Sequence, residues 1–570
     1  MEDEVLVEIC SSDDTFTWLC PNDRAVYYMF SADRTNELRF FDEIGGNEET
    51  VPHQEAVTAT LGWSPSQRYL AFLTREERFR DYPGGRATRR TWLMIHDSQG
   101  GQSRRVSDLD AVVESEAVWI TDDQLVFRVR NLDDPRGSMS RWVYDPGTGR
   151  HERCENVSKL RAIPELLDTA NTLVRLRDEA VLAVRGDEIR AVDLAAGKVT
   201  DLSGRWHGKV DHLEWIRPNA EGTSLLFCGR TTESTNRNLF RLTLDEGKLE
   251  RLSHEHSYNG KWIEGGRGYA YVGNTNNCFF LAVRRADGTA TDLFTSGWVR
   301  SYWPNPSGTA IYAEASVDAG PCGLWKYELE GRRLRRLRPG NKVPLVRSKI
   351  VAPDSRRYPS FDGLEIPTYL FAAVKGAGAV ARGTVVGIPP PTDQCNRYYQ
   401  PRPQVLSNLG FDYVGINYRG CDGYGLAYSA LFDEALAARD VVTVVRRMRE
   451  SGVIGTGPLY LVCQSGSGGV FRRVLELEPR LWTGCIAVKS ALGGVPKIDA
   501  STKRPPLLFV IGDSDPLLPV VRRELESIEA SGWACDFALI DNYAHLNVNP
   551  FGRRTKERRI AEFLREHPGP

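Results

Sequence analysis

No run of about 18 apolar residues, the length that crosses a bilayer as a helix, occurs in this chain of 570 residues. The acidic start, Met1–Glu4, leads into no apolar segment, so we expect neither a transmembrane helix nor a signal peptide. An excess of charge is lacking too, because 73 basic residues are balanced by 75 acidic ones and the formal net charge is −2. We therefore expect no binding to nucleic acid or to a membrane surface.

Residue patterns typical of disulfides and metal sites are also lacking. The 11 cysteines are odd in number and show no CxxC spacing, which favours free thiols in a reducing compartment and predicts a cytoplasmic location. The nine histidines form no HExxH group, and the nearest metal-like cluster, His254-Glu255-His256, is more typical of a solvated turn. We expect neither a metal nor an organic cofactor.

The length exceeds what one hydrophobic core organises, so two or more domains are expected. The first 345 residues contain a repeat, in which a tryptophan precedes a turn rich in Pro, Asn, Asp and Gly and then a short apolar run. A weaker unit begins near residue 167, and the clear units begin at Trp18, Trp63, Trp119, Trp215, Trp262 and Trp303.

Most of these starts are about 40 to 50 residues apart, which is the period of a four-stranded propeller blade. Seven units predict a seven-bladed β-propeller over residues 1–345, with a loop at 75–90 inserted into the second blade and the tryptophans packed between blades. The alternative is a pair of β-sandwiches with a coincidental tryptophan spacing.

Strands and helices alternate over residues 346–570, which predicts a doubly wound, mostly parallel sheet of the α/β-hydrolase type. The apolar strand Leu459–Val462 runs into a cluster of small residues around Ser465, and an amphipathic segment follows. This order is typical of a nucleophile elbow. Cys463 and Ser467 replace the usual glycines, so the elbow is degenerate, and a plain Gly/Ser loop is the alternative.

A serine nucleophile needs a base, and the base needs an acid that orients it. After residue 345 the only histidines are His545, in a polar turn after a strand, and His567, in a tail expected to be exposed. Asp515 ends another predicted strand. The chain order Ser465, Asp515, His545 is the order of α/β-hydrolases. The alternatives are a helix cap at Asp515 or Asp513 and a turn role for His545.

Three segments resemble motifs of one family. Asn417–Gly425 resembles N-x-R-G-S-x-G-Y-G, Ser360–Pro367 resembles S-x-D-G-x-x-I-P, and Gly512–Pro519 resembles G-x-x-D-x-x-V-P. By these motifs the chain resembles the prolyl oligopeptidase family, which includes dipeptidyl peptidases and acylaminoacyl peptidases. The resemblance implies an N-terminal β-propeller (residues 1–345) followed by an α/β-hydrolase catalytic domain (346–570). It also makes Asp515 the triad acid and places His545 at the family histidine.

The resemblance leaves two registers at the elbow. Aligning Gly468-Gly469 with the family glycines would put Gly466 at the nucleophile position and make the protein inactive. Aligning the flanking segments instead makes Ser465 the nucleophile, with Ser467 as the lesser alternative.

The oxyanion loop departs from the family pattern. The family's H-G-G-P is here Ile388–Pro391, where isoleucine offers no side-chain donor and the prolines have no backbone N–H. The N–H of Gly466 is left as the oxyanion-hole donor, with Tyr398 or Tyr399 as candidates to compensate.

We therefore predict a serine peptidase that cleaves short peptides or acyl-aminoacyl substrates through a Ser-Asp-His triad and an acyl-enzyme. The altered elbow and loop keep two alternatives open. One is an acyl or peptidyl transferase or cyclase in small-peptide biosynthesis, and the other is a catalytically weakened binding protein. The expected partner is a short peptide or small acylated substrate, and a homo-oligomer is left open.

Overall fold

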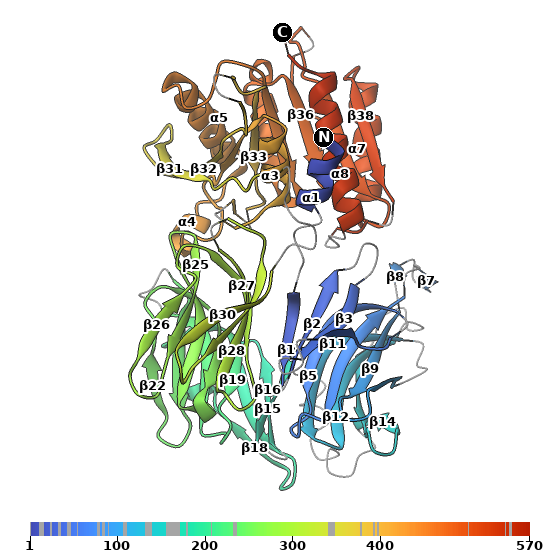
Figure 1. Cartoon of the computed structure of the whole chain (residues 1–570), viewed down its shortest axis with the longest axis vertical. Helices are drawn as coiled ribbons and strands as arrows, with labels where there is room; N and C mark the ends of the chain where they lie inside the picture. Colours follow the sequence, from blue (N-terminus) through green and yellow to red (C-terminus); the bar gives the residue numbers. More distant parts are fainter. Residues whose placement is uncertain are drawn as a thin grey trace.

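The computed structural model describes residues 2–569 with gaps at 11–15, 23–24, 32–35, 43–46, 54, 77–79, 83–85, 89, 107–110, 132–138, 155–171, 178–179, 207, 232–235, 318, 340–347, 377–378, 392–393, 396–397, 500, 542 and 546–549. The weaker repeat unit predicted near residue 167 begins outside the described residues. Figure 1 shows an α/β part above a group of small β-sheets.

Short antiparallel strands make up the N-terminal part. Three of its sheets have four strands each, in sequential order. The first holds β1 (Phe16–Pro21), β2 (Ala25–Ser31), β3 (Asn36–Asp42) and β4 (Glu48–Thr50). The second holds β15 (Thr172–Arg177), β16 (Ala180–Arg185), β17 (Glu188–Asp193) and β18 (Lys198–Asp201). The third holds β19 (Asp211–Pro218), β20 (Ser224–Arg230), β21 (Asn238–Thr243) and β22 (Lys248–Arg251).

Two further sheets have eight strands each. One contains β5 (Ala56–Trp63), β6 (Tyr69–Arg75), β9 (Thr91–Asp97), β10 (Gln102–Arg105), β11 (Ala111–Thr121), β12 (Gln124–Asn131), β13 (Met139–Tyr144) and β14 (His151–Arg153). The other contains β23 (His256–Ile263), β24 (Gly268–Thr275), β25 (Cys278–Arg284), β26 (Ala290–Leu293), β27 (Trp298–Pro304), β28 (Ala310–Ser316), β29 (Gly323–Glu328) and β30 (Arg333–Arg338). In each of these sheets a single parallel residue pair joins two groups of antiparallel strands. The pair is Thr91 with Val112 in the first sheet and Phe279 with Trp298 in the second.

The sheets follow one another in a closed ring. Strands β1, β5, β11, β15, β19, β23 and β27 each contact the next in this series, and β27 contacts β1. The arrangement is propeller-like. Inside the predicted insertion, β7 (Arg80–Tyr82) and β8 (Arg86–Thr88) form a separate two-stranded sheet.

Some of the periodic tryptophans connect neighbouring strands of the ring. The indole of Trp119 in β11 donates to Gly62 O in β5 at 3.1 Å, and that of Trp262 in β23 donates to Arg217 O in β19 at 2.8 Å. The packing role predicted for the tryptophans holds for these two. Trp303 differs, because 38% of its surface is exposed and its ring lies 3.4 Å from the Lys261 ammonium group.

The C-terminal part is a single sheet of eight strands with the order β31-β32-β34-β33-β35-β36-β37-β38. The first two neighbour contacts are antiparallel and the remaining ones are parallel. Its strands are β31 (Asp354–Pro359), β32 (Glu365–Phe371), β33 (Thr384–Ile388), β34 (Asp412–Ile416), β35 (Leu459–Gln464), β36 (Gly484–Val488), β37 (Leu507–Gly512) and β38 (Cys535–Ile540).

Helices cover both faces of this sheet. One buried apolar cluster contains side chains of α5, α6 and α7, and a second contains side chains of α1, α3 and α8. The helices are α1 (Glu2–Cys10), α3 (Pro401–Asn408), α4 (Leu426–Ser429), α5 (Glu434–Glu450), α6 (Gly468–Leu477), α7 (Leu518–Ala530) and α8 (Pro550–Glu566), with short 3₁₀ turns at Ser203–Arg205, Glu264–Gly266, Ser465–Ser467 and Pro479–Leu481. Over the described residues, every helix is too short or too polar to cross a membrane.

The long helix before the elbow starts later than its apolar pattern suggests. The sequence predicts a helix over 427–451, whereas α4 ends at Ser429 and α5 begins at Glu434. The Asp433 side chain accepts a hydrogen bond from Leu436 N at 2.8 Å and so caps α5 in the way that favours a helix start.

The N-terminal helix packs with the C-terminal part. Figure 1 shows α1 beside α3 and α8, and the three are in contact. Glu8 accepts a hydrogen bond from Ser348 N at 2.7 Å, and the Tyr399 hydroxyl donates to Ile9 O at 2.8 Å. Residues 2–10 were predicted within the first domain, but their packing partners lie in the second part of the chain.

The two motifs that contain Asp362 and Arg419 meet in a buried ion-pair network. Arg419 contacts Asp440 at 2.7 Å and Asp362 at 2.9 Å, and Ser360 donates to Asp440 at 2.5 Å. The side chain of Asp440 is fully buried and that of Arg419 is 6% exposed. These motif residues join the segments that follow β31 and β34 to α5.

We predict that Arg419→Met destabilises the protein by about 3–5 kcal/mol, because it leaves the Asp440 carboxylate buried without its cation. Urea denaturation measures the change in the free energy of unfolding. The matched control is Arg446→Met, which removes the more exposed ion pair with Glu478 and should cost less than about 1 kcal/mol. Equal losses in the two variants would contradict a structural role for the network.

Candidate active site

The elbow is a tight backbone turn at the carboxyl end of β35. Ser465 has a φ of +51°, a left-handed conformation that is strained for a serine. The turn packs closely on the loop after β36, because a Cβ on Gly468 would lie 1.9 Å from Ala491 O. The backbone strain expected of a nucleophile elbow is therefore present.

The second serine of the elbow has a different role. The Ser467 hydroxyl is buried, accepts a hydrogen bond from Gln464 N at 3.0 Å, and lies 3.0 Å from Ile388 O and 2.8 Å from Gln464 O. It ties the elbow to the end of β33. Of the two serines, Ser465 is the one within hydrogen-bond distance of a histidine.

The structure brings the three residues of the predicted triad together. Ser465 Oγ lies 2.9 Å from His545 Nε2, and His545 Nδ1 lies 2.9 and 3.1 Å from the two carboxylate oxygens of Asp515. The Asp515 side chain is fully buried and also accepts a hydrogen bond from Leu517 N at 2.9 Å. The order of groups matches a nucleophile, a base and an orienting acid.

Asp513, which the sequence offers as a possible helix cap, bonds instead to the backbone of the loop that contains His545. Its carboxylate accepts a hydrogen bond from Tyr543 N at 3.2 Å. The loop lies tightly against the end of β37, because a Cβ on Gly512 would be 1.5 Å from Tyr543 O. Asp513 and Gly512 thus position the loop, whereas Asp515 contacts the imidazole itself.

The loop that contains Pro389, Pro390 and Pro391 lies beside the turn at Gly466. Gly466 is exposed at the turn, and an added Cβ there would lie 3.7 Å from Pro390 and 3.6 Å from Pro391. The loop is held by the Tyr418 hydroxyl, which donates to Pro389 O at 2.7 Å.

Neither tyrosine proposed to compensate is shown in that role. The Tyr399 hydroxyl donates to Ile9 O, and the Tyr398 ring stacks on Trp298 with centroids 4.4 Å apart. The Gly466 N–H stays the predicted oxyanion donor.

Lys489, which the sequence analysis missed, lies directly behind the histidine loop. Its ammonium group donates to Ala544 O at 2.8 Å and to His545 O at 2.9 Å, and it lies 3.6 Å from the Tyr543 ring. Burial and, to a smaller extent, nearby cations lower the pKa of Lys489 to about 7. The one signal in the sequence was a lysine directly after a buried apolar strand.

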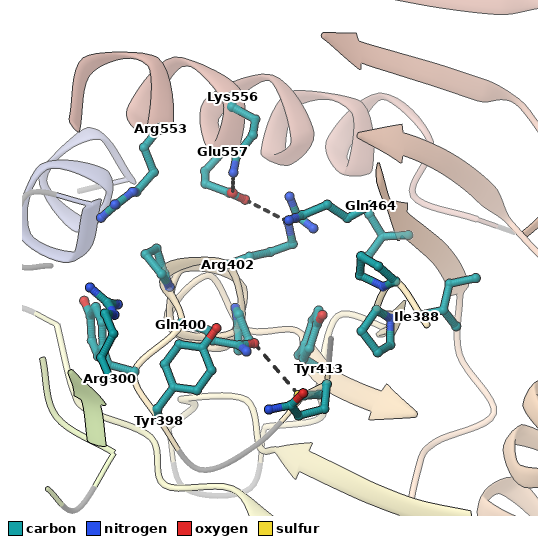
Figure 2. Close-up of a pocket in the computed structure, with 18 residues that line it drawn as sticks. Arg300, Ile388, Tyr398, Gln400, Arg402, Tyr413, Gln464, Arg553, Lys556 and Glu557 are labelled. Atoms are coloured by element: carbon teal, nitrogen blue, oxygen red, sulfur yellow. Dashed lines mark hydrogen bonds and ion pairs between the residues drawn. The ribbon is translucent and has the colours of Figure 1, made fainter. Parts of the chain in front are cut away.

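A pocket of about 410 Å³ lies beside the elbow. Figure 2 shows Gln464 and Ile388 at one side of it and the basic side chains Arg300 and Arg553 at the other. Residues 394–395 and 398–403, which include the start of α3, and one face of α8 form further walls. The volume is in the range of small-molecule sites.

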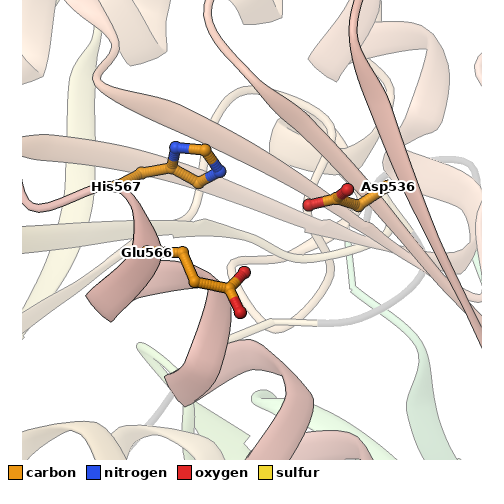
Figure 3. Close-up of side chains that lie close together, drawn as sticks. All are labelled: Asp536, Glu566 and His567. Carbon is orange, nitrogen blue, oxygen red and sulfur yellow. The ribbon is translucent and has the colours of Figure 1, made fainter.

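Three potential metal ligands lie together on β38 and the end of α8. Figure 3 shows Asp536, Glu566 and His567, whose ligand atoms lie within 4.8 Å of one another. His567 is half-buried, contrary to the prediction of an exposed tail, because its ring packs on Phe563 with centroids 4.6 Å apart. Glu566 is exposed, and such acidic groups are common without an ion. The ten described cysteines are free thiols.

Comparisons with known proteins reveal a shared fold. No family model matches the chain, and no curated protein matches it in sequence. The acylaminoacyl peptidase of Pyrococcus horikoshii is 13% identical with a TM-score of 0.73, and 98% of this chain and 97% of that one are covered. A puromycin-hydrolyzing peptidase of Mycobacterium tuberculosis is 12% identical with a TM-score of 0.75 and coverages of 99% and 96%.

A crystal structure of puromycin hydrolase is 14% identical, with a TM-score of 0.75 and coverages of 98% and 95%. These likenesses extend over nearly the whole chain, so the fold expected from the sequence motifs is confirmed at the level of overall architecture.

We predict that Lys489 makes stability depend on pH. Its pKa is about 7 in the folded protein and about 10.4 in an unfolded chain. Between these values the unfolded state binds more protons, so the free energy of unfolding rises with pH by at most about 1.4 kcal/mol per unit. Below about pH 7 both states are protonated and the contribution is constant.

In Lys489→Met this rise is absent, so the stability difference between wild type and variant changes across that window. Urea denaturation from about pH 6 to about pH 10 measures it. The control is Lys497→Met, which removes an exposed lysine and should give a difference independent of pH. A flat difference for Lys489→Met would refute the buried position of this ammonium group.

Proposed function

We propose that this protein is a serine hydrolase of the prolyl oligopeptidase type that cleaves short peptides or acyl-aminoacyl substrates. The observation that carries the proposal is the continuous hydrogen-bonded series from Asp515 through His545 to Ser465. Each of the three follows a different strand at the carboxyl edge of a parallel sheet, where α/β enzymes place their active sites. The solved structures with the same fold include peptidases.

The geometry supports a two-step mechanism. Ser465 Oγ attacks the substrate carbonyl carbon while His545 Nε2 takes the hydroxyl proton, and Asp515 stabilises the resulting imidazolium. The N–H of Gly466 donates to the developing oxyanion. His545 then gives its proton to the leaving group, and a water molecule activated by His545 hydrolyses the acyl-enzyme. The strained turn at Ser465 places its hydroxyl within reach of both His545 and the substrate carbonyl.

We also infer the domain organisation. The ring of seven successive strand contacts and the single residue pairs within the eight-stranded sheets support a seven-bladed propeller over residues 16–338. The strand order of the C-terminal sheet supports an α/β-hydrolase domain over 346–570, to which the helix at 2–10 is added by its packing.

The propeller would then restrict access to the site. Asn277, in the propeller, donates to Cys395 O at 2.9 Å and to the Tyr424 hydroxyl at 3.1 Å, and its own N–H donates to Gly423 O at 3.0 Å. These contacts hold the propeller over the edge of the sheet where Ser465 lies, so short peptides fit the proposal better than folded proteins.

Acyl transfer is the second candidate, because Pro390 and Pro391 lie beside Gly466 and supply no N–H to the oxyanion. An amine of the substrate would then resolve the acyl-enzyme in place of water. Incorporation of oxygen from ¹⁸O-labelled water into the product separates the two reactions, since only hydrolysis incorporates it.

We predict that a fluorophosphonate probe labels the protein stoichiometrically at Ser465, located by peptide mass spectrometry. Ser465→Ala should abolish the adduct, and His545→Ala should slow labelling by roughly 10³-fold or more, because the hydroxyl loses its base. Ser467→Ala is the matched control and keeps the label on Ser465 if it folds normally. An adduct on Ser467 would show that the elbow register is wrong, and no adduct would favour the binding protein.

A further inference from the structure

The pocket beside the elbow adjoins the proposed nucleophile. Gln464, the residue before Ser465, and the loop residues Pro389 and Pro390 line one end of it. Pro390 also lies beside Gly466, the proposed oxyanion donor. A group bound in this pocket would therefore belong to a substrate whose carbonyl lies at Ser465.

The walls of the pocket are rich in positive charge. Four basic side chains line it beside the carboxylate of Glu557, namely Arg300, Arg402, Arg553 and Lys556. Of these, Arg300 is paired at 2.8 Å with the buried Glu314, which lies outside the lining. Figure 2 shows Arg402 and Lys556 both joined to Glu557, with contacts of 3.3 Å and 2.9 Å. Two cations thus share one anion, and Arg553, which donates to Cys10 O at 3.3 Å, adds a further positive charge.

Arg402 has unused hydrogen-bonding capacity. It is 9% exposed, and its Nη2 atom is buried without a hydrogen-bond partner among the described residues. Buried charged donors are seldom left unpaired, because the loss of their contacts with water is costly. A guanidinium in this state is suited to a carboxylate, whose geometry matches its planar donors.

The electrostatic effects on neighbouring groups agree with an excess of positive charge. Burial tends to raise the pKa of Glu557, but Lys556 and Arg402 hold it below its usual value. The pKa of Lys489 is lowered most by burial. Lys556, Arg402 and Arg553 lower it as well, while Asp515 acts in the opposite direction. The pocket therefore favours an anion and disfavours a further cation.

We propose that this pocket is a subsite that binds a carboxylate of the substrate, with Arg402 as its main contact and Lys556 and Arg553 in support. The inference rests on the proposed function and names its substrate class, which is short peptides or acylated amino acids with a carboxylate close to the scissile bond. The carboxylate has two sources, the C-terminus of the substrate or an Asp or Glu side chain.

The first experiment compares matched substrates. N-acetyl-alanyl-alanine is assayed as the free acid and as the C-terminal amide, and N-acetyl-alanyl-aspartate amide is assayed beside its asparagine analogue. We expect kcat/KM to be about 10- to 100-fold higher for the carboxylate member of one pair, since a charge-assisted hydrogen bond of this kind is worth that much. A preference in the first pair identifies a C-terminal carboxylate, and one in the second identifies a side chain.

Variants test whether the pocket causes the preference. In Arg402→Met and in Lys556→Met the ratio of kcat/KM for acid over amide should fall at least about tenfold. Lys556→Met keeps the pair between Arg402 and Glu557, so it remains informative if Arg402→Met fails to fold. Arg558→Met removes an exposed arginine of the same helix and should leave the ratio unchanged. An unchanged ratio in Lys556→Met and in folded Arg402→Met would overturn the proposal.

A binding measurement separates this proposal from the proposed function. Calorimetry on Ser465→Ala protein, which cannot turn over substrate, compares the acid and amide members of each substrate pair. The subsite is supported if the acid of one pair binds at least tenfold more tightly and this preference is lost in the double variant with Lys556→Met. That conclusion holds even if fluorophosphonate labelling fails. Equal binding of acid and amide in both pairs overturns the subsite, and it leaves the hydrolase proposal intact where labelling succeeds.

Discussion

The site depends on how closely the histidine loop, residues Tyr543–His545, lies against the end of β37. The backbone of Tyr543 occupies the space that a side chain at Gly512 would need. Asp513 and Lys489 then hold the same loop from two sides through its N–H and carbonyl groups. Because these contacts fix the backbone, the imidazole of His545 reaches Asp515 and Ser465 at once. A glycine without a side chain thus sets the distance on which the proposed chemistry depends.

Buried charge recurs around this core, and each instance is compensated differently. Arg419 is shared between the fully buried Asp440 and the more exposed Asp362, so charge and hydrogen bonds are nearly matched there. Lys489 has carbonyl oxygens and an aromatic ring as partners, which stabilise an ammonium group less well than a carboxylate does. Arg402 shares Glu557 with Lys556 and keeps a buried donor unsatisfied. The compensation is complete where the role is structural and incomplete beside the proposed nucleophile.

The contact between propeller and sheet contributes directly to the pocket. Arg300 comes from β27, and Tyr398, which also lines the pocket, stacks on Trp298 of the same strand. Asn277 bonds the loop that contains Cys395, which lines the pocket as well. The shape of the pocket is therefore set by both parts of the chain, so a change in their relative position would change the pocket and the access to Ser465 together.

The sequence by itself determined what depends on near neighbours and on chain order. Three features could be predicted from the sequence, namely the apolar strand before Ser465, the order Ser465, Asp515, His545 and the tryptophan period. Each depends on local structure, because a strand end, a tight turn and a repeated hairpin are formed by residues close together in the chain. Helix starts were less certain, since a cap at Asp433 outweighed a continuing apolar pattern. The roles of Lys489 and Arg402 were decided by tertiary structure alone. Their partners lie 56 and 155 positions away in the sequence. Only the packed fold determines whether a buried cation has an anion beside it.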